Sequence, residues 1–392
     1  MEAHRFLTHS LQDARVTRIL ATALDAVEPG KLVRNYLLKN PLPKRRDIYL
    51  LGIGKASEAM TFAAALTLPT FADALVITKH ASSQTLERVT VIEGGHPVPD
   101  ERSLAAGQSA LEFVSHLNED DLLICFISGG GSALVTQPIE NLTLQDIQAI
   151  TSNLLSSGAS INEINSLRRQ IDRIKGGGLA RATKAQVISL ILSDVIGNPL
   201  ETIASGLTVD PTLGRRVENF IIGDINVAVQ AALNQAIHEG YDSEIFSLNI
   251  QGEAKETGKQ LAEKLKEERK KKKHPFCIIA GGETTVTIRS NGKGGRNQEL
   301  ELGAVDRLDG VQDVMLISLA TDGDDGPTDA AGAVVNGETC QRAKRLGMST
   351  ADYLSRNDAY VYFQSLDDLI KTGYTGTNVN DLIFLLGFQT LR

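Results

Sequence analysis

Six polar turns in the sequence each follow an apolar run that is typical of a buried β-strand. The turns combine glycine with hydroxyl, basic or acidic residues, and they read GIGKAS, GGHPVPD, SGGGSA, LSDVIGNP, GGETTV and ATDGDDGPTDAAG. In sheets of parallel strands, ligands bind at the carboxyl ends of the strands. Together these turns therefore predict a ligand-binding site at the strand ends.

The SGGGS turn is the strongest candidate for binding an anion. Glycine lets backbone N–H groups approach an anion closely, and serine hydroxyls add further donors. The alternative is a tight strand-to-helix turn that needs positive φ angles. The predicted contacts are Ser128, Gly129, Gly130, Gly131 and Ser132.

Two basic residues stand where a helix is expected to begin. Lys55 follows the GIG turn, and Arg296 lies in GGRNQE. A cation beside the positive end of a helix dipole is unfavourable, so both positions favour an anionic ligand. The planar guanidinium of Arg296 suits carboxylate or phosphate. An ordinary surface lysine is the alternative for Lys55.

Acids and one histidine occupy the other turns. Asp194 follows the run VISLIL and suits a general base, a metal ligand or a helix cap. His96 lies in a turn bounded by prolines and has either a structural or a substrate-binding role. Glu283 follows a further strand-like run, FCIIAGG.

The segment TDGDDGPTD concentrates four carboxylates in eight residues. They are Asp322, Asp324, Asp325 and Asp329. Carboxylates this dense repel one another unless a cation or hydrogen-bond donors neutralise them. Mg²⁺ uses one or two carboxylates together with phosphate oxygens, so Asp322 and Asp325 are predicted metal ligands. A helix-capping turn is the alternative.

Strand-like runs alternate with helical stretches along the chain, which predicts α/β domains with mainly parallel sheets flanked by helices. A chain of 392 residues exceeds what one hydrophobic core usually serves. The pattern restarts around VENFIIGDIN, so we expect an N-terminal domain over 1–218 and a C-terminal domain over 219–392. The basic run KEERKKKK is expected to be a solvated helix end.

The net charge of the chain bears on which partners it could bind. A net charge of −8 favours neither nucleic acid nor an anionic membrane as a binding partner. No run reaches the roughly 18 apolar residues that span a bilayer. The three cysteines lie far apart without a CxxC pair, which fits a reducing cytoplasm.

Four common functional motifs are missing from the sequence. They are the nucleotide-binding motifs GxxxxGK[ST] and GxGxxG, the zinc-binding motif HExxH and the nucleophile motif GxSxG.

The sequence resembles the glycerate 2-kinase family, whose C-terminal region is called MOFRL, over nearly the whole chain. The resemblance also includes the stretches LLSSGASINEINSLRRQIDRIKGGGLA, LSDVIGNPLETIASGLTVDPT, GGETTVTIRSNGKGGRNQE and TGYTGTNVNDLIF. One departure is SGLT at 205–208, where the family commonly has a proline after the glycine.

This resemblance implies ATP-dependent phosphorylation of D-glycerate at the 2-hydroxyl, giving 2-phosphoglycerate and ADP. It also implies two α/β domains, the N-terminal one Rossmann-like, with the active site in the cleft between them. The implied cofactors are ATP and Mg²⁺, the substrates are small molecules, and a homodimer is left open. Lys55 and Arg296 are expected to neutralise negative charge, and Asp194 is expected to act as the general base. Asp322 and Asp325 are the expected Mg²⁺ ligands. His96 and Glu283 are expected to contact substrate, nucleotide or metal.

Two other functions compete with the kinase. Members of this family have often been labelled hydroxypyruvate reductases, an activity that needs NAD(P)H, and the missing dinucleotide motif argues against it. A non-catalytic protein that binds small anionic metabolites would also use glycine-rich turns, but it would not need Asp194 or the aspartate-rich loop. Phosphorylation at O3 rather than O2 is a further alternative within the kinase interpretation.

Overall fold

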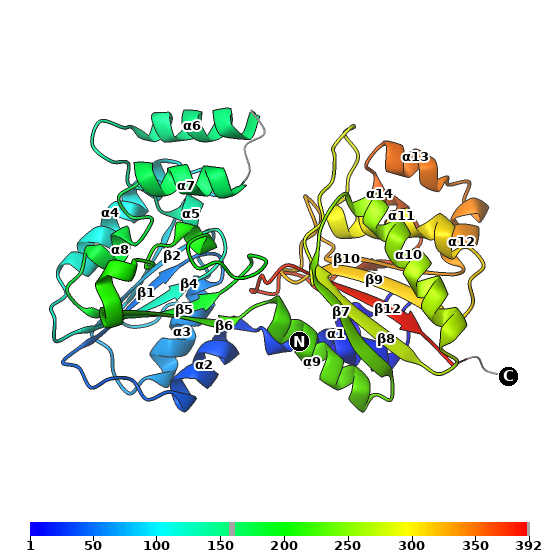
Figure 1. The fold of residues 1–392 in the computed structure, drawn as a ribbon, viewed down its shortest axis with the longest axis horizontal. Coiled ribbons are helices and arrows are strands. Elements are labelled where there is room, and N and C mark those ends of the chain that lie inside the picture. The colour runs from blue at the N-terminus through cyan, green and yellow to red at the C-terminus, as the bar shows by residue number, and fades with distance from the viewer. Residues whose placement is uncertain (157–160, 390–392) are drawn as a thin grey trace. The chain divides into compact units, whose positions relative to one another are not determined.

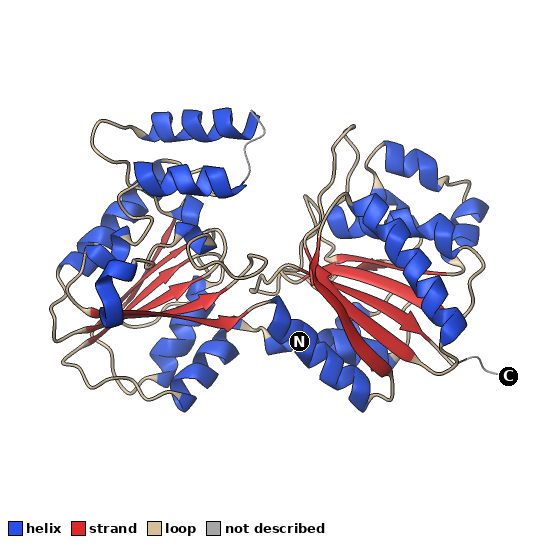
Figure 2. Ribbon diagram, in the orientation of Figure 1, coloured by secondary structure: helices blue, strands red, loops and turns tan. Residues whose placement is uncertain are grey.

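The computed structural model describes residues 1–156 and 161–389, which fold into two compact units. The first unit is Glu28–Asp224, and the second unit combines Met1–Val27 with Ile225–Arg392 (Figure 1). Each unit has its own sheet with helices on both faces (Figure 2). The α/β class expected from the sequence is confirmed in both units.

These units differ from the predicted domains at two places. The strand β6 (Val217–Gly223) pairs with the first sheet, so the first unit extends to Asp224 rather than to 218. The N-terminal helix α1 (Ala14–Ala26) packs against α9 (Ile225–His238), so residues 1–27 belong with the C-terminal part of the chain. Hydrophobic periodicity shows that α1 buries one face, but it does not show which helix covers that face.

The first unit is built on six parallel strands in the order β3-β2-β1-β4-β5-β6. This is the strand order of Rossmann folds. Its elements are α2 Pro29–Lys39, β1 Ile48–Ile53, α3 Ser57–Thr67, β2 Asp73–Thr78, β3 Val89–Glu93, α4 Glu101–Ser115, β4 Leu122–Ile127, α5 Gly131–Leu134, α6 Leu144–Ser156, α7 Ile161–Ile171, α8 Gly178–Arg181, β5 Gln186–Leu192 and β6 Val217–Gly223, with 3-10 turns at Ile203–Ser205 and Pro211–Arg216. Residues 157–160, within the stretch LLSSGASINEINSLRRQIDRIKGGGLA of the family resemblance, lie outside the described residues.

Burial explains the composition of the first sheet. Every residue of β4, with the sequence LLICFI, is buried, because helices cover both faces of a central parallel strand. The helix α3 packs on β1, β2 and β4, and α4 packs on β2 and β3. Asp100 begins α4 by accepting hydrogen bonds from the backbone N–H groups of Arg102 and Ser103.

The second unit has a mixed sheet in the order β11-β10-β9-β12-β8-β7. Strands β7, β8, β9 and β11 run in one direction, and β12 and β10 run in the other. Its further elements are a 3-10 turn at Ala3–Phe6, β7 Asp242–Ile250, α10 Ala254–Lys271, β8 Phe276–Gly282, α11 Arg296–Leu308, β9 Val314–Ala320, β10 Gly332–Asn336, α12 Thr339–Arg345, α13 Thr350–Ser355, α14 Ala359–Ser365, β11 Leu369–Ile370 and β12 Asp381–Gly387. The reversed strand β12 therefore begins at the edge of the sheet where β8 and β9 end.

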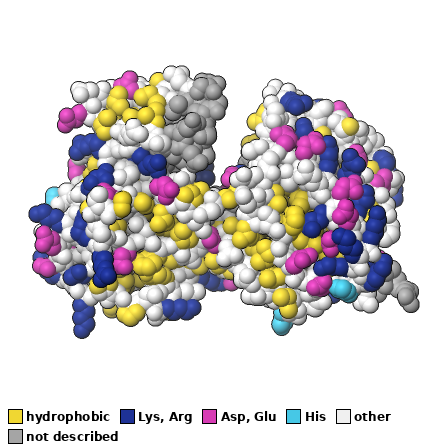
Figure 3. Space-filling view, viewed as in Figure 1, with side chains coloured by type: hydrophobic (Ala, Val, Ile, Leu, Met, Phe, Trp, Pro, Cys, Tyr) yellow, Lys and Arg dark blue, Asp and Glu magenta, His cyan; other side chains and the backbone are white. Residues whose placement is uncertain are grey.

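The basic run of the sequence forms the end of α10, as predicted. Glutamates and lysines pair along the helix, for example Glu256 with Lys259 and Glu268 with Lys271. Figure 3 shows basic and acidic side chains interspersed over α10. Within the described part of the chain, no helix is both long enough and apolar enough to cross a membrane.

One of the buried acids of the second unit has no hydrogen-bond partner within the described residues. Glu301, on α11, is fully buried between the core residues Leu300 and Leu302, and within the described residues its carboxylate oxygens have no hydrogen-bond partner. Burial raises the pKa of Glu301 well above its ordinary value. Burial therefore favours the protonated, neutral form of this carboxyl group.

A neutral acid in the core makes the stability depend on pH. Because the pKa of Glu301 is higher in the folded chain, the folded state loses stability as the pH rises above the unfolded value of about 4.3. We expect Glu301→Leu to raise the free energy of unfolding at pH 8 by about 1–3 kcal/mol, with a smaller gain at pH 4.5. Urea denaturation at both pH values measures this difference.

The matched control is Glu267→Leu, which changes an exposed glutamate of α10. This control should alter the unfolding free energy little at either pH. A Glu301→Leu variant that is less stable than the parent at pH 8 would contradict the assignment of Glu301 as a neutral, unpaired core acid.

Candidate functional site

Hydrogen bonds connect the turns after β1 and β4 at the carboxyl edge of the first sheet. The backbone N–H of Lys55 donates to the carbonyl of Gly129 at 2.9 Å, and that of Ala56 donates to the Ser128 hydroxyl at 3.0 Å. Strands β1 and β4 are neighbours, but the next strand after β1 is β2, on one side, and the next strand after β4 is β5, on the other. The strand order therefore reverses its direction between β1 and β4. Such a switch point is where ligands bind in open α/β sheets.

The glycines of the SGGGS turn leave room for three side chains from other turns. A Cβ atom at Gly129 would overlap the Asp194 carboxylate. A Cβ atom at Gly130 would lie 3.1 Å from Cγ of Lys55 and 3.2 Å from Cδ2 of His96. Gly130 also has a φ of +84°, which a side chain would strain. The structure therefore brings together Lys55, His96 and Asp194, which come from the ends of three different strands.

His96 is neutral in this cluster. Burial lowers its pKa to about 4, and the nearby positive charge of Lys55 acts in the same direction. The turn that carries His96 is held by Ser103, whose hydroxyl accepts a hydrogen bond from the N–H of Gly95 at 3.0 Å. A neutral imidazole at this position can donate or accept a hydrogen bond without adding charge.

The hydroxyls of the two serines of the turn both make hydrogen bonds within the protein. Ser128 is buried, and its hydroxyl accepts the hydrogen bond from Ala56, so it stabilises the turn itself. The hydroxyl of Ser132 lies 2.8 Å from that of Ser205. Sequence analysis did not select Ser205, because it does not directly follow a strand.

The departure at SGLT is accommodated by the core. Gly206 has a φ of +65°, and Leu207, at the position of the usual proline, is fully buried in the hydrophobic core of the first unit. The leucine therefore anchors the turn through packing, where proline would restrict the backbone.

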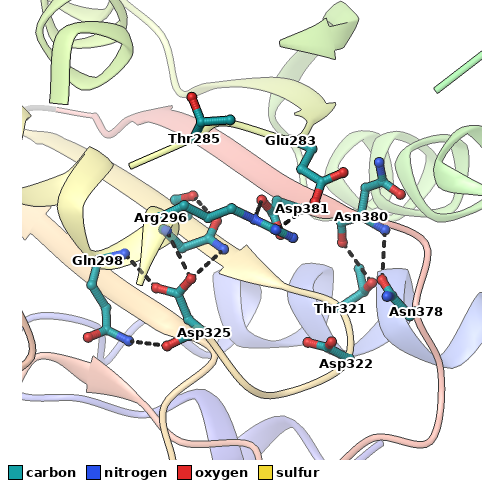
Figure 4. Close-up of polar contacts among 12 residues, drawn as sticks. Glu283, Thr285, Arg296, Gln298, Thr321, Asp322, Asp325, Asn378, Asn380 and Asp381 are labelled. Atoms are coloured by element: carbon teal, nitrogen blue, oxygen red, sulfur yellow. Dashed lines mark hydrogen bonds and ion pairs between the residues drawn. The ribbon is translucent and has the colours of Figure 1, made fainter. Parts of the chain in front are cut away.

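A second cluster lies at one edge of the sheet in the second unit (Figure 4). Arg296 begins α11 and makes two hydrogen bonds to Asp381, at 2.6 and 3.0 Å, and one to Glu283 at 2.6 Å. Burial alone would lower the pKa of Arg296, but the Asp381 and Glu283 carboxylates raise it. The guanidinium is therefore charged and held in a fixed orientation.

Strand register explains why these acids meet. Asp381, the first residue of β12, lies opposite Gly282 of β8 and Ala320 of β9. Glu283 directly follows Gly282, and Asp322 follows Ala320 by two residues. The ends of two strands and the start of the strand between them therefore place three carboxylates at one edge.

Asp325 has a different role from the predicted metal ligand. Its buried carboxylate accepts hydrogen bonds from the backbone N–H groups of Asn297 at 3.1 Å and Gln298 at 2.8 Å (Figure 4). Burial raises the pKa of Asp325 to about 7. Asp325 thus caps the first turn of α11, and no cluster of three or more His, Cys, Asp or Glu suited to a metal occurs among the residues described.

Two family models and several known proteins match this chain. A model of the MOFRL family matches residues 276–381, and a model of a domain of unknown function, DUF4147, matches residues 15–238. The D-glycerate 2-kinase of Thermotoga maritima is 38% identical, with 93% of this chain and 96% of that protein covered. The chain belongs to the glycerate 2-kinase family.

Two further relatives support this membership. The glycerate 2-kinase of Pyrococcus horikoshii is 33% identical, with 94% of this chain and 96% of that protein covered. The crystal structure of a glycerate kinase from Thermotoga maritima superposes with a TM-score of 0.89 at 37% identity, covering 95% of this chain and 98% of that one. The resemblance found in the sequence is thereby confirmed.

The residue of this second cluster that sequence analysis missed is Asp381. The acids expected from the sequence come after predicted strands, whereas Asp381 begins β12, which runs antiparallel to its neighbours. The start of an antiparallel strand lies at the same edge as the ends of the strands beside it. An acid placed directly before the apolar run LIFLLG was the available signal.

The charge of Lys55 is predicted to influence the titration of His96. In the parent protein we expect His96 to titrate near pH 4, followed by NMR of its ring protons and assigned with His96→Gln. Lys55→Met should raise the pKa of His96, because a nearby positive charge disfavours the imidazolium. The exposed Lys44→Met in the same unit should leave the pKa of His96 unchanged. Titration at the ordinary histidine value of about 6.5 in the parent would show that His96 does not occupy this environment.

Proposed function

We propose that this protein transfers the γ-phosphoryl group of ATP to the 2-hydroxyl of D-glycerate, giving 2-phosphoglycerate and ADP. The observation that carries the proposal is the convergence of Lys55, His96 and Asp194 on the glycine turn at the switch point of the first sheet. A base, a cation and a neutral hydrogen-bonding group beside the half-buried Gly130 suit an anionic substrate that carries a hydroxyl group.

Phosphoryl transfer depends mainly on positioning and on stabilisation of charge. The ammonium group of Lys55 offsets negative charge next to the SGGGS turn. The carboxylate of Asp194 is the group that accepts the proton of the attacking 2-hydroxyl. His96, being neutral, orients the substrate through a hydrogen bond. Gly129 and Gly130 let the substrate contact the backbone between these groups.

In the second unit, Arg296 is the cation suited to stabilising negative charge on a phosphoryl group. Its two partners differ in exposure, since the side chain of Glu283 is 46% exposed and that of Asp381 is 4% exposed. Asp381 is therefore the fixed partner that orients the guanidinium. Glu283 is the partner that a phosphate oxygen can replace.

A divalent cation fits the acids at this edge of the second unit. When bound, Mg²⁺ neutralises charge on the phosphate oxygens of ATP. Asp322 and Glu283 are the carboxylates that would hold it, because Asp325 is already committed to the N–H groups of α11. A cytoplasmic location suits the reaction, since ATP is available there and the three cysteines are unpaired thiols.

The turn after β1 supports the reductase alternative less well than it supports the kinase. The dinucleotide fingerprint requires a third glycine or an alanine, and the sequence has Ser57 at that position. An acid near the end of the second strand would bind the adenosine ribose, but β2 ends at Thr78 and Lys79 follows. Gly54 instead makes a close approach to Ser128.

Product analysis tests the reaction and its regiochemistry. Incubation of the purified protein with D-glycerate, ATP and Mg²⁺ should give a phosphorus NMR signal coupled to the proton on C2. A phosphorus signal coupled to the C3 protons would replace the 2-kinase by a 3-kinase. A parallel sample holds hydroxypyruvate and NADH, and NADH consumption there without phosphoglycerate in the first sample would support the reductase.

Removal of either cation should impair catalysis strongly. Lys55→Ala and Arg296→Ala are each expected to lower kcat/KM roughly 100-fold or more, because each removes charge stabilisation of the transition state. Steady-state kinetics with D-glycerate and ATP measures the loss. Lys44→Ala and Arg307→Ala, which change exposed residues of the two units, serve as matched controls with parental kinetics. Near-parental kinetics in a Lys55 or Arg296 variant would exclude that residue from the mechanism.

A further inference from the structure

A polar pocket lies at the amino edge of the first sheet, opposite the edge that carries the SGGGS turn. Its volume is about 600 Å³, and its charged lining consists of Arg45, Lys184, Arg215, Arg216 and Glu119. These residues lie one to three positions before the start of a strand: Arg45 before β1, Glu119 before β4, Lys184 before β5, and Arg215 and Arg216 before β6. Because the strands are parallel, their amino ends meet at one edge, away from the SGGGS turn.

The cavity is strongly basic on an acidic protein. Four basic side chains less one carboxylate leave three positive charges in the lining, whereas the whole chain has a net charge of −8. Across the described ranges, none of the four basic residues takes part in an ion pair. Cations gathered in this way repel one another unless an anion neutralises them. Figure 3 shows basic side chains, with some acidic ones among them, over the end of the unit where β6 begins.

Two of the four basic groups are held in place by neutral acceptors. Arg216 donates to the carbonyls of Thr183 at 2.8 Å, Ala185 at 3.0 Å and Ala180 at 3.0 Å. Arg45 donates to the side-chain oxygen of Gln186 at 2.6 and 3.1 Å. These bonds fix both guanidinium groups without cancelling their charge, which pre-organises the cavity for an anion.

We infer that this cavity is a second binding site, for a small polyanion with two or more negative charges, such as a phosphorylated metabolite. Arginine forks match phosphate oxygens, and the volume lies within the range of small-molecule sites. Strand β5 has seven residues and spans about 20 Å between the two edges of the sheet, so a ligand here does not occupy the SGGGS site. This inference does not depend on the proposed kinase activity.

Calorimetric titration with inorganic pyrophosphate, at constant ionic strength and without divalent metal, tests the site. All proteins carry Lys55→Ala, so that binding at the SGGGS turn is weakened. Lys184→Gln combined with Arg215→Gln should weaken pyrophosphate binding at least tenfold. Both side chains are exposed, so the folded state should be retained, and thermal unfolding checks this.

The matched control is Lys270→Gln combined with Lys273→Gln, which removes the same charge from exposed lysines of the second unit. This control should bind pyrophosphate as its parent does. Arg45→Gln supplies an independent variant of the cavity, with the same expected weakening. Equal affinity in the cavity variants and the control would overturn the inference. Equal weakening of pyrophosphate binding in the cavity variants and in the control would also overturn the inference, because it would show a response to net charge alone.

Discussion

The absence of side chains at Gly129 and Gly130 is the constraint on which the first unit's site depends. The Asp194 carboxylate, the Lys55 stem and the His96 ring all lie against these two residues, so any Cβ atom would displace them. The surrounding fold brings these groups to one point. Parallel strands end at one edge, and the order of β3, β1, β4 and β5 places the three side chains around the turn after β4.

In the second unit, the structure compensates for an unfavourable interaction between a cation and a helix dipole. Arg296 stands at the first turn of α11, where the helix dipole disfavours a cation. The structure offsets this cost with acids, since Asp325 caps the N–H groups of the helix and Asp381 holds the guanidinium. The position of Arg296 was interpreted from sequence as evidence for an anionic ligand. The protein itself supplies part of that negative charge, so the position of the cation by itself does not establish a ligand.

The first sheet has polar groups at both edges, but the two edges differ in their charge. At the carboxyl edge, Lys55 lies with Asp194 and the neutral His96, which is a mixture suited to chemistry on a hydroxyl. At the amino edge, four basic residues face one acid, which is suited to holding charge. The same parallel sheet thus has a cluster of mixed charge at one edge and a basic pocket at the other.

The sequence by itself determined the α/β class, the SGGGS turn and the members of both clusters that come after strands, because these depend on local periodicity and turn chemistry. Only the tertiary structure decided that α1 joins the C-terminal unit and that Asp381 belongs with Arg296. It also decided that Asp325 caps a helix, because a carboxylate in a dense acidic loop suits a metal and a helix end equally well until its neighbours are known. Each of these outcomes depends on which residues distant in sequence become neighbours. Strand direction and helix packing settle that pairing, and neither is encoded in a local pattern.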